Sequence, residues 1–221
     1  MKNILGHYKV IFYNKAILWN VVVSVLLFAI STIATYLAYD YTRATGGTVV
    51  QDIILDHLPV YDVAPLFFGG MLLLIMIPLG IGLWDPRRIP FGLEVTAAFF
   101  VVRSLFMIMT HLSPPNIAYY NVIEREHHVA NVLFSLSSGT DMFFSGHTGY
   151  PFLMALLMWD IKVWRYFFLI FSVVMAITVL VGHLHYSIDV FAAYFIAHGV
   201  YVAARRIFAD EYALISIATN E

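Results

Sequence analysis

Long runs of apolar residues, separated by shorter polar segments, occupy most of the chain. Each run comes close to the roughly 20 residues that an α-helix needs to cross the hydrocarbon core of a bilayer. The runs cover residues 16–38, 64–84, 91–112, 142–160, 163–183 and 187–204. This pattern predicts an all-α fold, a polytopic membrane protein with six transmembrane helices in a single transmembrane domain over residues 1–221.

The composition supports a bilayer as the main solvent. Hydrophobic residues make up 61% of the 221 residues and charged residues 12%, whereas soluble domains contain about 45–50% and about 25% respectively. The first apolar run is too long for a cleaved signal peptide, so residues 1–15 are expected to be a cytoplasmic N-terminal segment. The absence of cysteine excludes disulfides and cysteine nucleophiles. The net charge of -2 does not bear on nucleic acid binding, but the sequence has no basic patch, so no nucleic acid partner is predicted.

Lysine and arginine are distributed unequally between the two sides of the predicted helices. If the N-terminus is placed on the inner side of the membrane, the outer side carries only Arg43 and Arg125 among the residues between the spans. The inner side then carries Lys2, Lys9, Lys15, Arg87, Arg88, Lys162, Arg165, Arg205 and Arg206. Because cytoplasmic loops are enriched in these residues, both termini are predicted to be cytoplasmic. The linkers 39–63 and 113–141 are then expected on the periplasmic, extracellular or luminal side.

Polar residues that could carry chemistry gather at the outer ends of three predicted helices. Ser145–Thr148 and Gly182–Asp189 each lead into a helix from outside. Arg103 lies inside the third predicted helix, which runs outward through Thr110. Ionisable residues inside a membrane are costly, and they are functional candidates by default. We therefore expect these three segments to converge on one site in the outer leaflet.

The spacing of His185 and Asp189 is the most informative detail of this set. Residues four apart share one face of a helix, so Asp189 can accept a hydrogen bond from the imidazole. Such a contact sets the tautomer and leaves the other ring nitrogen as an oriented nucleophile or base. His147 is then the natural general acid for a leaving alkoxide.

The residues around His147 are suited to hold a phosphate group. Ser145, Gly146 and Thr148 surround a predicted helix start, where free backbone N–H groups and the helix dipole attract anions. Gly146 permits close approach of the phosphate, and Arg103 could clamp its oxygens. Together with the histidines and Asp189, these groups favour phosphoryl transfer.

Two of these motifs carry a resemblance to a known family. Ser145–Thr148 and His185–Val190, followed by Ala193–Ile196, resemble the two catalytic motifs of the sphingomyelin synthase family, a branch of the type 2 phosphatidic acid phosphatase superfamily. The resemblance covers roughly residues 95–200, the expected catalytic core, and it extends to Asp141, His183, Arg103 and Thr110. It implies six helices with the site on the outer or luminal face. It also implies that His185 is the nucleophile, Asp189 its orienter and His147 the acid.

The resulting hypothesis is a lipid phosphotransferase. It would move a phospho-head group from a membrane phospholipid, through a phosphohistidine on His185, to a lipid alcohol such as ceramide. With water as acceptor, the same residues would form a lipid phosphate phosphatase or a phospholipase C-like hydrolase. A dry pocket open to lipid favours transfer, and a water-filled mouth favours hydrolysis. The third hypothesis is a non-catalytic lipid-binding membrane protein, which would tolerate His185→Gln.

Individual residues also have other interpretations. His183, His185 and Asp189 could bind zinc, although a helix start with serine and glycine suits phosphate better, and neither a metal nor another cofactor is predicted. Arg103 could serve as a structural partner of Asp141. Acidic and histidine side chains of the outer loop could select a head group, namely those of Glu124, Glu126, His127 and His128. The sequence alone does not determine the head group, the acceptor or the oligomeric state.

Overall fold

The computed structural model describes residues 15–116 and 142–219, and the regular elements of this part of the chain are helices. In chain order the α-helices are α2 (Lys15–Thr45), α3 (Ala64–Trp84), α4 (Ile89–Thr110), α7 (Gly146–Leu157), α8 (Lys162–Val181), α9 (Ser187–Ile207) and α10 (Ala209–Thr219). Two 3-10 turns are η1 (Leu55–His57) and η2 (Pro86–Arg88). The all-α prediction is confirmed for the described residues.

Five helices are long and apolar enough to cross a membrane. They are α2, α3, α4 together with its preceding turn, α8 and α9. Their outward faces carry large apolar side chains, such as Trp19 with 66% of its surface exposed and Phe195 with 79%. Aromatic surfaces of this size, repeated over several helices, are suited to contact with lipid rather than with water. The five helices fit an integral membrane protein.

The structure of residues 142–160 differs from the membrane-spanning helix that was predicted there. Its helix, α7, has 12 residues, which corresponds to roughly 18 Å and falls short of the roughly 30 Å of a hydrocarbon core. The prediction of six transmembrane helices is therefore not confirmed. The chain before α7 is extended at Ser145, with φ -62° and ψ 111°, and the helix ends before Met158. Side chains of neighbouring helices surround α7, so this segment does not need a helix of full membrane length.

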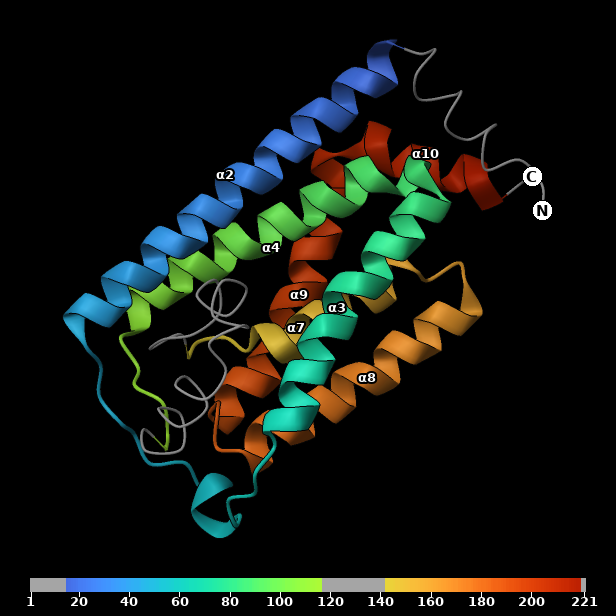
Figure 1. Cartoon of the computed structure of the whole chain (residues 1–221). Coiled ribbons are helices and arrows are strands. Elements are labelled where there is room, and N and C mark those ends of the chain that lie inside the picture. The colour runs from blue at the N-terminus through green and yellow to red at the C-terminus, as the bar shows by residue number, and fades with distance from the viewer. Residues whose placement is uncertain (1–14, 117–141, 220–221) are drawn as a thin grey trace.

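The structure also contains helical residues outside the predicted runs. The first helix continues past residue 38 to Thr45, and a short helix, α10, follows α9 where none was expected. In α10, Tyr212 packs on Phe91 of α4 with their ring centroids 5.0 Å apart. The Arg205 guanidinium lies 4.4 Å from the centre of the Tyr212 ring. These contacts place α10 across the beginning of α4 (Figure 1).

The position of α7 between longer helices determines where the site forms. In Figure 1, α2 runs along α4 on the outside of the bundle, while α7 lies inside it. Gly149 allows the close packing, because a Cβ atom there would lie 3.0 Å from the ring of Phe99 on α4. From α8, the Ser172 hydroxyl donates a hydrogen bond to the Thr148 carbonyl at 2.8 Å. The first turn of α7 is thus fixed from two sides.

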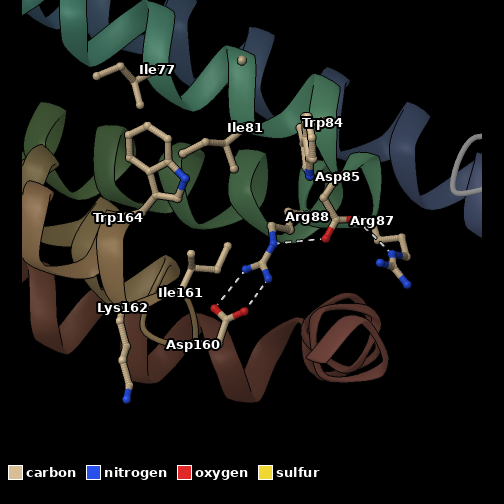
Figure 2. A pocket seen from close by; sticks show the side chains of 11 residues that line it. Ile77, Ile81, Trp84, Asp85, Arg87, Arg88, Asp160, Ile161, Lys162 and Trp164 are labelled. Carbon is tan, nitrogen blue, oxygen red and sulfur yellow. Dashed lines mark hydrogen bonds and ion pairs between the residues drawn. The ribbon is translucent and has the colours of Figure 1, made fainter. Parts of the chain in front are cut away.

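A buried ionic cluster fixes the opposite end of α7. Arg88, at the start of α4, forms two hydrogen bonds with the carboxylate of Asp160, one of them 3.0 Å long, and a third of 3.2 Å with Asp85 (Figure 2). Arg87 and Arg88 belong to a predicted inner loop, and within it they are buried, with exposed fractions of 8% and 6%. Burial of these charges is offset by their pairing with carboxylates. The cluster joins the turn between α7 and α8 to α4.

A cavity of about 870 Å³ lies beside this ionic cluster, with Ile77, Ile81 and Trp164 among its lining residues. Figure 2 shows the side chain of Lys162 pointing away from Arg88 and Asp160. The charges that do face one another are already paired, so the cluster has a structural explanation. His147 lies at the opposite end of α7, and His185 follows the opposite end of α8.

Candidate active site

The connection between α8 and α9 carries the second histidine motif. It begins after Val181, where α8 ends, and His183 adopts the left-handed region with φ 50°. This conformation is uncommon for a residue with a side chain, and it turns the chain sharply toward α9. The Asp189 carboxylate then accepts a hydrogen bond from the Tyr186 N–H at 2.9 Å, as part of a capping box at the start of α9. Asp189 therefore has a defined orientation.

The imidazole of His185 lies between two hydrogen-bond acceptors. Its Nδ1 atom is 3.0 Å from the Met142 carbonyl oxygen and 3.4 Å from Oδ2 of Asp189. A carbonyl oxygen can only accept, so Nδ1 carries a proton, and in the neutral ring Nε2 carries the lone pair. The predicted pairing with Asp189 is present, and a backbone carbonyl that the sequence did not reveal lies closer.

His147 lies beside His185, in the first turn of α7. The centroids of the two rings are 6.1 Å apart, a separation at which one small group can contact both side chains. From α3, Phe67 packs on His147 with a centroid distance of 4.3 Å. Both histidines are buried, with 9% and 4% of their surfaces exposed. The site is therefore enclosed by α3, α7 and the connection between α8 and α9.

Arg103 reaches the same place from α4. Its Nε atom donates to the Phe144 carbonyl at 3.1 Å, and its Nη1 atom lies 3.6 Å from the sulfur of Met107. A Cβ atom at Gly146 would lie only 3.0 Å from this Nε atom. Glycine at the start of α7 therefore allows the guanidinium to approach the helix terminus.

Several buried polar atoms around His147 have no hydrogen-bond partner within the part of the chain that the structure describes. They are the hydroxyl oxygens of Ser145 and Thr148 and the Nδ1 atom of His147. Ser145 occupies the N-cap position of α7 but makes no side-chain capping bond. Buried polar groups of this kind are rare and need an explanation. A bound anion at this helix N-terminus would satisfy the hydroxyl groups.

The other predicted site residues either form hydrogen bonds with backbone carbonyls or lie outside the described residues. The Thr110 hydroxyl donates to the Phe106 carbonyl of its own helix at 2.9 Å, rather than toward the histidines. The Nε2 atom of His183 is 3.0 Å from the Leu58 carbonyl oxygen, with which it forms a hydrogen bond. Asp141 and the outer-loop residues Glu124–His128 lie outside the described residues. Within residues 15–116 and 142–219, no group of three His, Asp or Glu side chains could hold a metal ion.

Sequence reasoning missed Asp52, a buried carboxylate next to the site. Its Oδ2 atom accepts from the Ser187 N–H at 2.6 Å, and its Oδ1 atom accepts from Ile54 and Leu55 N–H groups at 2.9 and 3.2 Å. Burial acts to raise the pKa of Asp52, but the bonds from Ser187, Leu55 and Ile54 outweigh it and lower the pKa. The available signal was an acidic residue two positions before Ile54 in an apolar linker, which is typical of a turn cap.

Comparison with protein families gives independent support for a superfamily assignment. Residues 138–206 match the family model described as PAP2 superfamily C-terminal, and this segment contains both histidine motifs. Comparisons with curated proteins and with solved structures gave no match. The family match supports assignment of the chain to the type 2 phosphatidic acid phosphatase superfamily, and with it an enzyme of the lipid phosphatase or phosphotransferase type.

Proposed function

We propose that this protein is a membrane lipid phosphotransferase of the sphingomyelin synthase type. Its donor is a glycerophospholipid, and its acceptor is a lipid hydroxyl such as that of ceramide. The observation that carries the proposal is the pairing of a histidine whose Nε2 atom holds a lone pair with a second histidine 6.1 Å away at a helix start. The unsatisfied hydroxyl groups of Ser145 and Thr148 supply donors for a phosphoryl group beside this pair.

In the first step, Nε2 of His185 attacks the phosphorus atom of the donor. The bond between phosphorus and the diacylglycerol oxygen breaks, and His147 gives its proton to that oxygen. The ring of His185 gains positive charge as the new bond forms. Asp189 and the Met142 carbonyl, both on the Nδ1 side, stabilise this charge. The products are diacylglycerol and a phosphohistidine that carries the head group.

The second step transfers the head group to the acceptor. His147, now neutral, removes the proton of the acceptor hydroxyl, whose oxygen attacks phosphorus and releases His185. Arg103, the hydroxyl groups of Ser145 and Thr148 and the free N–H groups of α7 hold the phosphoryl oxygens in both steps. The proton that His147 gives to diacylglycerol in the first step is replaced by the acceptor's proton in the second step. The two steps together therefore return both histidines to their starting states.

Hydrolysis is the second candidate function, because water could replace the lipid hydroxyl. The exposed fractions of the reacting side chains favour transfer: His185 is 4% exposed, and Ser145 and Asp189 are fully buried. Exclusion of water protects a phosphorylated intermediate from hydrolysis. This burial supports a lipid hydroxyl as the acceptor.

We also propose the orientation that follows from the distribution of lysine and arginine. Both termini lie in the cytoplasm, and the histidines face the periplasmic, extracellular or luminal side. The segment 142–160 passes from the histidine end to the Arg88–Asp160 end as a sixth crossing, shielded from lipid by α3, α4, α8 and α9. The catalytic core corresponds to residues 95–200 within a single domain.

Lipid turnover by the purified protein tests the proposal. The protein in nanodiscs is incubated with phosphatidylcholine, phosphatidylethanolamine or phosphatidic acid, each with and without ceramide, and the products are identified by mass spectrometry. We expect diacylglycerol and a phosphosphingolipid that form only together. Diacylglycerol that forms equally well without ceramide would instead establish the hydrolase.

Two histidine variants separate catalysis from lipid binding. His185→Ala is expected to abolish turnover, because it removes the nucleophile while the rest of the site is retained. His198→Ala removes an exposed histidine of the same helix bundle and serves as the matched control. Unchanged turnover in His185→Ala would eliminate the covalent mechanism. Failure of wild type to convert any lipid pair, together with retained lipid binding in His185→Gln, would favour the non-catalytic hypothesis.

A further inference from the structure

One segment of the outer linker crosses the connection between α8 and α9. Residues 48–61, here called the strap, lie between α2 and α3 and contain η1. The C-terminal end of the strap contacts the beginning of this connection. The Tyr61 N–H donates to the Val181 carbonyl at 3.1 Å, and the Leu58 carbonyl is 3.0 Å from Nε2 of His183. The strap therefore lies directly against the residues that precede His185.

Asp52 links the strap to the start of α9. Its carboxylate binds strap N–H groups with one oxygen and the Ser187 N–H, at 2.6 Å, with the other. Ser187 is the first residue of α9, and its N–H is one of the helix-terminal donors that lack a partner within the helix. Asp52 thus caps α9 from a segment that is 135 residues distant in the sequence.

Tyr186 makes the second link, on the other side of the connection. Its hydroxyl group accepts from the Val50 N–H at 3.1 Å and donates to the Ser113 carbonyl at 2.9 Å. The side chain is 1% exposed and packs with Leu55 and Met142. Tyr186, which follows His185 in the chain, is therefore tied both to the strap and to the segment after α4.

These links divide the capping of α9 between two carboxylates. Asp52 satisfies the Ser187 N–H, while Asp189 satisfies the Tyr186 N–H at 2.9 Å and lies 3.4 Å from Nδ1 of His185. Asp189 is the acidic residue in the first turn of α9, so without Asp52 its carboxylate is a candidate acceptor for the Ser187 N–H. Its movement toward this donor would withdraw it from His185, and the His185 ring would lose one of the two acceptors that hold it.

We propose that Asp52 and Tyr186 are positioning residues that hold His185 and Asp189 in their reactive arrangement through the strap. This inference rests on the proposed function for its effect on turnover, but not for its effect on the geometry of His185. The strap forms hydrogen bonds with residues on both sides of His185 in the chain, namely Val181, His183, Tyr186 and Ser187. Contacts of this kind can fix catalytic side chains from outside their own helices.

The test compares Asp52→Asn with Asp56→Asn in the full-length protein in nanodiscs. Asparagine has nearly the same shape as aspartate but only one acceptor oxygen, so it must present an NH₂ group either to the Ser187 N–H or to those of the strap. Asp56 lies on η1 and is exposed, so Asp56→Asn changes the same charge in the same segment without touching α9. Tyr186→Phe is the second variant, which keeps the ring and removes only the hydroxyl group.

The first readout is the ¹⁵N NMR signal of His185 in histidine-labelled protein, assigned by its loss in His185→Gln. Wild type and Asp56→Asn are expected to show Nδ1 protonated and Nε2 unprotonated. Asp52→Asn and Tyr186→Phe are expected to show a mixture of tautomers. A His185 signal in both variants identical to that of wild type would overturn the positioning role, whether or not the protein acts on lipids.

The second readout is lipid turnover, in which kcat and KM are measured separately. Asp52→Asn is expected to lower kcat about tenfold or more, with KM for the donor lipid within about twofold of wild type, because supporting residues act on the reacting groups rather than on binding. An altered His185 signal with undiminished kcat would refute the link to catalysis. If wild type turns over no lipid while the His185 signal responds as expected, the proposed function fails and the placement of His185 by the strap is retained.

Discussion

At the scale of single residues, His185 illustrates how one side chain depends on contacts of different range. The spacing of four residues predicts its pairing with Asp189. The structure contains this pair at 3.4 Å and adds the Met142 carbonyl at 3.0 Å. Both acceptors lie on the Nδ1 side, so they favour the same tautomer. His183 forms a hydrogen bond with the Leu58 carbonyl in the strap, and its predicted supporting role stays a prediction.

Asp52 leads to a prediction about stability and pH. Its pKa is lowered in the folded protein, so its ionised form stabilises the fold at pH values above its ordinary pKa of about 4. This contribution is lost as the pH falls through the lower, folded-state pKa. We expect the difference in melting temperature between wild type and Asp52→Asn to be largest near pH 7 and to shrink below about pH 4. Thermal unfolding in detergent at several pH values measures it.

The pH comparison has an internal control in Asp56→Asn. This exposed carboxylate belongs to the same segment, so its loss should change the melting temperature little at any pH. A difference between wild type and Asp52→Asn that stays constant from pH 7 to pH 3 would contradict the assignment of the stabilisation to the ionised carboxylate.

At the scale of the elements, the beginning of α7 brings together most of the groups proposed to bind phosphate. A helix N-terminus, a buried serine and a guanidinium meet there because Gly146 has no side chain. The other end of α7 is held by the pairing of Asp160 with Arg88. A short helix with both ends fixed in this way has little freedom to shift along its axis, and His147 keeps its place beside His185.

Gly146→Ala tests the close approach of Arg103. The added Cβ atom would lie 3.0 Å from Nε of Arg103, so the guanidinium must move away from the helix start. We expect turnover to fall about 10- to 100-fold, since small displacements of charged groups in an active site have effects of this size. Gly199→Ala in α9 is the matched control, because no atom lies within 4 Å of the added Cβ atom. Equal turnover in the two variants would remove Arg103 from the proposed phosphate site.

At the scale of the whole molecule, the histidines and the ionic cluster lie at opposite ends of one helical bundle. The strap is found at the histidine end, while α10 and the beginning of α2 lie at the other (Figure 1). A reaction on lipid head groups requires the histidine end to face one of the two membrane surfaces. From the distribution of lysine and arginine, we propose that it faces the outer surface.

Labelling of introduced cysteines tests this orientation directly. The chain has no cysteine of its own, so single cysteines can replace Asp56 in the strap and Arg206 near the end of α9 without a background signal. In intact cells, we expect a membrane-impermeant maleimide to label Asp56→Cys at once and Arg206→Cys only after permeabilisation. The reverse pattern would place the histidines on the cytoplasmic side.

The sequence was sufficient to predict the all-α class, the approximate positions of the five long helices and the set of residues proposed for the site. These properties follow from apolar runs and from short motifs, both of which are local in the chain. The folded chain was needed to show that α7 has 12 residues and that α10 packs on α4. It alone also placed the Met142 carbonyl against His185 and Asp52 against Ser187. Contacts between residues far apart in the chain leave no periodic pattern, because they depend on how whole helices pack.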